Sequence, residues 1–121
     1  MNCWMNPINA WGGDTRAGAH PVKNFRIISD VLNPSATWVT IDENPASIND
    51  GWFVCDPARP TAWVDIPSTY HNGAGGLSYA DGHSEIKKWR DPSILGKKAT
   101  PNAAPKDKNV DLLWLEARST Y

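Results

Sequence analysis

The clearest pattern of apolar and polar positions in this chain lies at residues 76–89 (GLSYADGHSEIKKW). Asp81-Gly82 stands there between two alternating runs, which predicts a β-hairpin with a two-residue type I′ turn, because both turn residues then need positive φ. In this register the opposed pairs are Ala80 and His83, Ser78 and Glu85, and Leu77 and Ile86. The core face would carry Leu77, Tyr79 and Ile86. The polar face, open to water, would carry Ser78, His83, Glu85 and Lys87.

Two further segments have the composition of strands. Residues 36–42 (ATWVTID) are rich in β-branched residues and alternate, so Val39 and Ile41 should share one face and Trp38 and Thr40 the other. Residues 52–55 (WFVC) predict a second short strand that ends at Asp56-Pro57. Both should join the hairpin in one antiparallel sheet.

The C-terminal segment 109–118 (NVDLLWLEAR) predicts a short helix. Asn109 can cap it, and Val110, Leu113 and Trp114 follow at the i, i+3, i+4 spacing of a buried helical face. A buried final strand is the competing interpretation. Elsewhere we expect irregular structure at 1–21, strand or helical turn at 25–32, a loop at 56–72 with a helical turn near 67–70, and a solvated loop at 92–108. The predicted fold class is α+β, a small antiparallel sheet with long loops and a short C-terminal helix in one domain, 1–121.

Composition narrows the class of partner. The 121 residues include 12 Lys and Arg against 13 Asp and Glu, a formal net charge of -1, so we expect no nucleic-acid partner. No apolar run approaches the roughly 20 residues needed to cross a bilayer, and the chain opens on no signal peptide, which predicts a soluble molecule.

The cysteines, Cys3 and Cys55, match neither a redox pair nor a zinc ribbon and leave a disulfide or two free thiols open.

A loop dense in oxygen ligands follows the predicted strand 36–42. Calcium takes six to eight oxygens from carboxylates, amides, carbonyls and water, so this loop together with the hairpin turn suits a calcium site. The candidate ligands are Asp42, Glu43, Asn49, Asp50 and Asp81, with Asn44 and Ser47 beside them. The spacing is not that of an EF-hand, and the alternative is that these side chains only cap turns.

A second candidate set is His71, Asp81 and His83, which are residue types that bind zinc or iron. A metal-activated water there would make the protein a small hydrolase of esters or lactones. The alternative is that His71 orders the Gly-rich loop and His83 is solvated. Ser78 lies in a loose G-x-S-x-G pattern, but that motif needs a strand, a turn and a helix, and a hairpin strand surrounds Ser78 here.

Seven tryptophans are unusual in so short a chain. Exposed, coplanar Trp side chains would favour a carbohydrate-binding module, whereas Trp in a small domain more often supplies core area, so we expect most of them to be at least half buried. The set is Trp4, Trp11, Trp38, Trp52, Trp63, Trp89 and Trp114.

The segment YHNGAGGLSYADGHSEIKKW, with His71, nine residues and then Asp81-Gly82, resembles the H-x9-DG segment of prepilin-type, or pseudopilin-like, proteins. MNCWMN, WVTIDENPASINDGWF and NVDLLWLEARST are also similar to blocks of that family. The resemblance implies a pilin-like head with a long N-terminal helix across an antiparallel sheet, an assembly role in a type II secretion or pilus-like system, and an extracytoplasmic location. It also implies partners that are other pilin-like subunits or further copies of the chain, and calcium in a loop. Because the processing site and hydrophobic helix are missing, we expect a truncated head or a reading frame that starts inside a longer gene.

Overall fold

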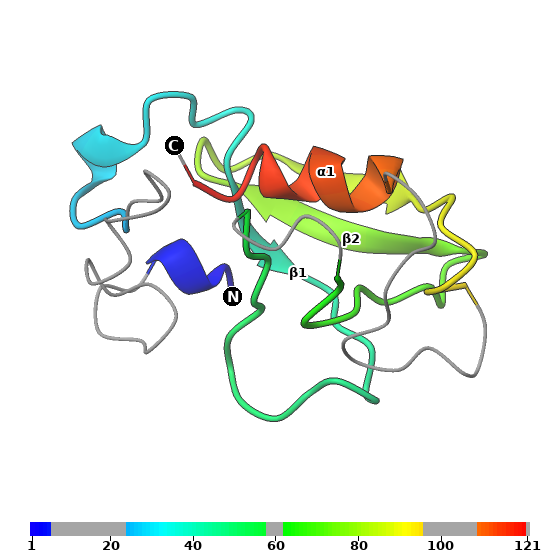
Figure 1. The fold of residues 1–121 in the computed structure, drawn as a ribbon. Helices are drawn as coiled ribbons and strands as arrows, with labels where there is room; N and C mark the ends of the chain where they lie inside the picture. Colours follow the sequence, from blue (N-terminus) through cyan, green and yellow to red (C-terminus); the bar gives the residue numbers. More distant parts are fainter. Residues whose placement is uncertain (6–23, 58–61, 96–108, 121) are drawn as a thin grey trace.

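A computed structural model describes residues 1–5, 24–57, 62–95 and 109–120 (Figure 1). Within them lie two 3-10 helices, η1 (Cys3–Met5) and η3 (Ile28–Asp30), the strands β1 (Trp38–Ile41), β2 (Ala74–Tyr79) and β3 (Ser84–Lys88), and the helix α1 (Val110–Glu116). The described strands form one antiparallel sheet in the order β1-β2-β3. Figure 1 shows α1 lying along one face of this sheet. The predicted α+β class, a small antiparallel sheet with a C-terminal helix, is confirmed.

The hairpin has a three-residue loop instead of the predicted two-residue loop. Tyr79 donates its backbone N–H to His83 O at 2.9 Å, and Gly82 donates to Tyr79 O at 3.0 Å. Gly82 has φ 93°, whereas Asp81 is not among the described residues with positive φ. These are the features of a turn followed by one left-handed glycine, the usual three-residue hairpin connection. The positive φ of Gly82 is confirmed, and the type I′ turn is wrong.

The extra loop residue shifts the register of the hairpin by one position. Leu77 pairs with Glu85 and Gly76 pairs with Ile86, and a one-residue shift turns every side chain of β3 to the other face. Leu77 and Tyr79 are buried as predicted, but Ile86 is 72% exposed. Glu85 and Lys87 lie instead on the α1 side, where Glu85 accepts a hydrogen bond from Tyr79 Oη and Lys87 contacts Asp111 of α1.

The hairpin turn provides a first test of this geometry. A methyl group at Gly82 would meet no atom within 4 Å, so any cost of Gly82→Ala comes from holding alanine at positive φ. We expect a loss of about 1 kcal/mol in the free energy of unfolding, measured by urea denaturation. The matched control is Gly51→Ala, which also enters open space but at an ordinary φ. Equal denaturation midpoints for the two variants would contradict the left-handed turn.

β1 departs from the alternation predicted for it. Trp38 pairs with Tyr79 and Thr40 with Ser78, so the register shifts between them and Val39 forms an irregularity in the strand. As a result Trp38 and Ile41 both pack on the main core, although alternation placed them on opposite faces. Thr40 is exposed. The predicted opposition of these faces is therefore wrong.

Residues 52–55 do not form the predicted strand of the sheet. Phe53 makes an isolated parallel bridge with Asn2, in which Phe53 donates its N–H to Met1 O at 2.6 Å and accepts from Cys3 N at 3.2 Å. The N-terminal segment, not the hairpin, is thus the partner of this stretch. The helical turn expected near 67–70 is also absent from the described residues, since Pro67 instead bridges Glu43.

The C-terminal helix is confirmed, but its buried face differs from the predicted one. Asn109 Oδ1 accepts from the backbone N–H groups of Asp111 and Leu112, as an N-cap residue does. Val110 is 71% exposed, whereas Leu112 and Leu115 are fully buried. Asp111 and Glu116 are buried with them, so the inward face is partly acidic. A pattern based on apolar residues alone does not predict such a face.

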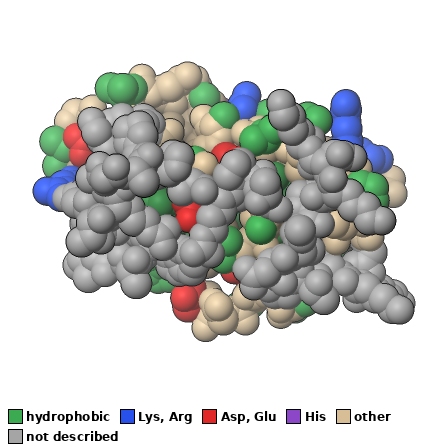
Figure 2. Space-filling model, in the orientation of Figure 1, with side chains coloured by type: hydrophobic (Ala, Val, Ile, Leu, Met, Phe, Trp, Pro, Cys, Tyr) green, Lys and Arg blue, Asp and Glu red, His purple; other side chains and the backbone are tan. Residues whose placement is uncertain are grey.

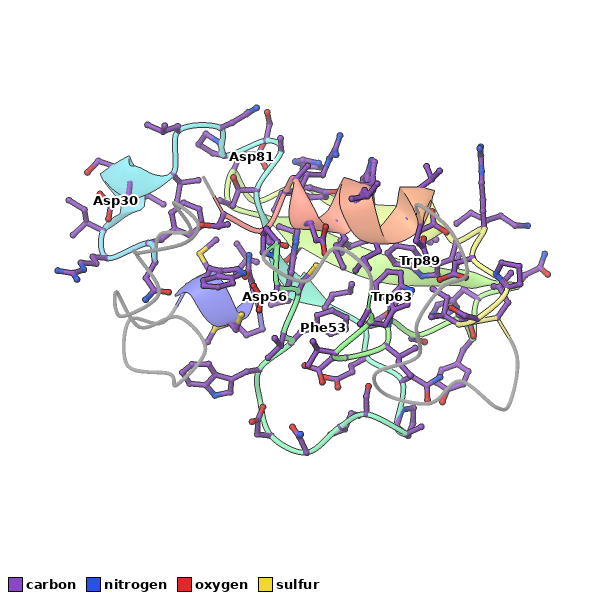
Figure 3. All side chains as sticks on the ribbon, viewed as in Figure 1. Asp30, Phe53, Asp56, Trp63, Asp81 and Trp89 are labelled. Carbon is purple, nitrogen blue, oxygen red and sulfur yellow. The ribbon has the colours of Figure 1, made fainter. Side chains whose placement is uncertain are left out.

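Tryptophans dominate the interior, as Figure 3 shows for Trp63 and Trp89 beneath α1. The main core contains Trp38, Phe53, Trp63, Leu77 and Trp89 with residues of α1. A second cluster around η1 contains Cys3, Trp4, Phe25, Val31 and Val54. All six described tryptophans are buried or part-buried, which confirms the core interpretation for them. Trp11 lies outside the described residues, as do most of the segments 1–21 and 92–108.

The cysteines, left open between a disulfide and free thiols, are two buried free thiols. Burial raises the pKa of Cys3 to about 12 and also raises the pKa of Cys55, so neither forms the reactive thiolate readily. The segment 25–32, left open between strand and helical turn, contains the 3-10 helix η3. No helix in the described part of the chain is long and apolar enough to span a membrane.

Candidate functional site

The H-x9-DG residues build the two ends of the central strand β2. At its start, His71 N donates to Ala74 O at 3.3 Å, and Ala74 N donates to His71 O at 3.2 Å. Asn72 and Gly73 between them have φ of 53° and 80°. His71 thus begins a tight, left-handed turn that leads the chain into β2.

At the other end of β2, Asp81 organises the hairpin loop. One carboxylate oxygen accepts from His83 N at 3.1 Å and lies 2.5 Å from His83 Nδ1. The hydrogen bond from the His83 side chain, followed by that from its backbone, lowers the pKa of Asp81. The His83 ring also stacks on Tyr79, with ring centroids 4.3 Å apart. Asp81 and His83 are therefore brought together as a turn-stabilising pair.

His71 is not brought to that pair. The six residues of strand β2 lie between His71 and Asp81. Because a strand rises about 3.4 Å per residue, His71 and Asp81 lie roughly 20 Å apart along the sheet. Zinc ligands bind at about 2 Å, so one ion cannot reach both. In Figure 3 Asp81 and Trp89, which lies beside the His71 turn, are at opposite ends of the sheet. The trio proposed for a metal-dependent hydrolase is thus divided by β2.

The proposed calcium ligands around residues 42–50 act as hydrogen-bond acceptors, Asp42 towards the backbone of β2 and Glu43 and Asp50 within their own loop. Asp42 accepts from Gly76 N at 3.0 Å, Glu43 from Ser47 Oγ at 2.9 Å, and Asp50 from Trp52 N at 2.7 Å. Asn44 accepts from Ala46 N in the same manner. The local contacts of Glu43, Asn44 and Asp50 are those expected of side chains that cap turns, whereas Asp42 links the end of β1 to β2. Asn49 is exposed, and Asp81 lies at the far end of β2.

Glu43 and Asp50 of this set lie near Asp65, a carboxylate that the sequence pattern did not single out. Burial raises the pKa of Glu43, and the nearby Asp65 and Asp50 raise it further, against the Ser47 hydrogen bond. Asp65 is buried and accepts from Val54 N at 2.5 Å. Across the described ranges, however, no cluster of three or more His, Cys, Asp or Glu side chains has the geometry to hold a metal ion.

Ser78 lies within β2, as the sequence predicted, and not on a strand-turn-helix elbow. Its hydroxyl contacts Thr40 Oγ1 at 2.6 Å and accepts from Thr40 N at 3.2 Å. Its cross-strand partner is Ser84, whereas the predicted register placed Glu85 there. The His83 ring contacts Asp81 and Tyr79 instead of Ser78, so the described structure does not form the Ser78-His83 pair that a serine nucleophile would need.

A buried polar network that sequence reasoning missed ties β3 to α1. Asp91 accepts from Trp63 Nε1 at 2.6 Å, from Ser93 N at 2.8 Å and from the Asn109 side chain. Asp111 accepts from Asp91 N at 2.8 Å and from Arg90 N. The Asp-Pro-Ser sequence at 91–93 is a recognisable turn signal, but only the fold shows that this turn receives the helix cap.

A pair of buried carboxylates forms the second feature that the pattern did not predict. Glu116 is 5% exposed, and its Oε1 has no hydrogen-bond partner. Burial, and then repulsion by Asp56, raise the pKa of Glu116 to about 7. Figure 3 places Asp56 beside η1, next to the main core. Glu116 is therefore partly protonated at neutral pH.

The comparisons with known proteins assign no family. No protein-family model, no curated protein and no solved structure matches this chain. The positions of the motif residues in the fold are therefore the main support for any functional assignment.

Proposed function

We propose that this chain is the head domain of a pilin-like subunit, which acts outside the cytoplasm by assembling with other subunits. The observation that supports this best is the position of the H-x9-DG residues. His71 and Asp81-Gly82 close the turns at the two ends of the central strand, so the motif shapes a sheet. A motif that served a catalytic centre would bring its polar groups to one point.

The face of the sheet opposite α1 also suits an assembly role. It carries a shallow hollow of about 430 Å³ whose lining includes the small residues Gly76, Ser78 and Ser84 and the larger Thr40, Asp42 and Ile86. A helix that packs in this hollow would lie over the short side chains of Gly76, Ser78 and Ser84 and would contact the exposed Ile86. We place on this face the long N-terminal helix that the family resemblance implies.

Neither calcium nor a metal-dependent hydrolase is part of this proposal. The candidate hydrolase residues lie at opposite ends of β2, and the carboxylates of residues 42–50 already satisfy backbone and hydroxyl donors. A structural role requires no change in these hydrogen bonds.

Incorporation into a filament tests the proposal. The chain would be fused behind the processing site and N-terminal helix of a well-studied pseudopilin and produced in a strain that overexpresses the matching assembly system. We expect the fusion in the sheared surface fraction. The control carries an unrelated α+β domain of similar size and should stay in the membrane fraction. A folded, exported fusion that behaves like this control would contradict the proposal.

A further inference from the structure

β3 is an edge strand whose outer side is open in the described structure. It pairs only with β2 there, and Ser84, Ile86 and Lys88 are exposed. The other edge strand, β1, is partly covered, because Asn2 donates its N–H to Val39 O at 2.8 Å and its side chain to Trp38 O at 2.9 Å. An open edge presents unpaired N–H and C=O groups to any strand that fits it.

The register shows which residues present these groups. Tyr79 N donates to His83 O, and Trp89 N donates to Gly73 O. In an antiparallel pair, residues alternate between hydrogen-bonded and non-hydrogen-bonded positions. Glu85 and Lys87 therefore bond inward to β2, and Ser84, Ile86 and Lys88 direct their backbone groups away from the sheet. Lys88 O accepts from Lys87 Nζ at 3.2 Å, a contact that a pairing strand would replace. Ile86 is the middle residue of this outward set.

We propose that β3 pairs edge to edge with β3 of a second copy of this chain, antiparallel about a two-fold axis through Ile86. Ile86 would then face Ile86 of the second copy in a hydrogen-bonded pair, and Ser84 would face Lys88. Two three-stranded sheets would become one continuous sheet. The contact is isologous and closes as a dimer. It does not depend on the pilin assignment.

The charges of β3 favour this pairing over other registers. Glu85 faces Lys87 of the second copy, and Lys87 faces Glu85, so two opposite-charge pairs form on the α1 side. Lysines on an edge strand usually discourage pairing. Here a glutamate stands at the matching position on the other side of the axis, which makes the edge complementary to itself.

The surroundings of the edge add contact area. A groove of about 450 Å³ runs along β3 beside Trp114 of α1. Figure 2 shows Lys and Arg side chains along the upper edge of the molecule, on the side where Figure 1 places α1 and the hairpin. Five paired residues bury less than the roughly 800 Å² per partner of a standard interface, so we expect a weak, concentration-dependent dimer.

Sedimentation equilibrium of the purified chain over a range of concentrations tests the dimer. Ile86→Asp places two carboxylates at the axis and should weaken association at least tenfold. Its side chain is exposed, so the monomer should stay folded by circular dichroism. The matched control is Ile28→Asp, which alters an isoleucine of nearly the same exposure on η3, 74% against 72% for Ile86, and it should associate like the parent. A parent that stays monomeric, or equal association of the two variants, would overturn the proposal.

Charge reversal tests the register. Glu85→Lys and Lys87→Glu each create like-charge pairs across the axis and should weaken association, whereas the double variant restores both pairs and should recover it. Both side chains also contact their own chain, so the melting temperature of each variant is measured alongside. A double variant that is folded but no better than the single variants would overturn the proposed register.

Cross-linking provides the third measurement. Opposed residues of a hydrogen-bonded pair have α-carbons about 5.5 Å apart, within the range for a disulfide. Ile86→Cys should therefore form a covalent dimer on oxidation. Ser84→Cys is four residues from its own equivalent across the axis, and should not. Equal cross-linking of the two cysteine variants would contradict the β3 pairing. A chain that stays monomeric but still enters filaments would contradict the β3 pairing and not the pilin-like function.

Discussion

Replacing Asp91 with alanine should lower the free energy of unfolding by about 3 kcal/mol, because a buried donor left without its acceptor costs about 1 to 3 kcal/mol. Trp63 Nε1 and the Asn109 side chain both donate to the Asp91 carboxylate, and both residues are buried. Burial raises the pKa of Asp91, but hydrogen bonds from Ser93, Trp63 and Asn109 outweigh it and lower the pKa overall. The carboxylate form is therefore the one that holds β3 and α1 together.

Urea denaturation of the Asp91→Ala variant measures this loss. The control is Asp50→Ala, which removes an exposed carboxylate that accepts from Trp52 N at 2.7 Å, a contact that water can replace. It should cost less than about 1 kcal/mol. Amide and indole hydrogen exchange gives a second measure, since the Trp63 indole proton should exchange faster in the Asp91 variant. If the two variants unfold at the same urea concentration, the network contributes little.

The stability of the protein should fall as pH rises from about 4.5 towards 7, and Glu116 should cause much of that fall. The pKa of Glu116 is raised to about 7 in the folded protein by burial and by Asp56, from an ordinary value of 4.5. Between these values the folded state binds more protons than the unfolded state, so raising the pH favours unfolding. Above pH 7 the buried carboxylate is charged and its Oε1 has no partner.

Glu116→Gln tests this directly, because the amide keeps the shape and cannot ionise. At pH 8 the variant should be more stable than the parent by about 1 to 3 kcal/mol, the cost of burying an unsatisfied group. At pH 4.5 both side chains are neutral, so the two proteins should have nearly equal stability, which is the internal control. Glu43 and Asp65, whose pKa values burial also raises, contribute equally to both proteins. A constant difference across this range would exclude Glu116 as the titrating group.

Local signals in the sequence were sufficient for several elements. The Asp-Gly pair predicts a hairpin because glycine alone adopts positive φ without a steric cost, and Gly82 does so. Asn109 predicts a helix start because its side chain can reach the first free N–H groups, and it does. The β-branched stretch at 36–42 predicts β1. Each of these depends on residues that are neighbours in the chain.

The tertiary structure decided which faces of these elements are buried. One added loop residue at the hairpin moved Ile86 to the solvent and turned Glu85 and Lys87 towards α1. A shift in the register of β1 brought Trp38 and Ile41 onto the same core, and α1 buried Asp111 and Glu116 in preference to Val110. Apolar periodicity cannot predict such faces, because the buried Asp111 carboxylate is stabilised by the backbone N–H groups of Arg90 and Asp91, which a distant segment brings to it. The same cause separates the candidate sites: His71 and Asp81 are ten residues apart in sequence, but the extended strand between them holds them at opposite ends of the sheet.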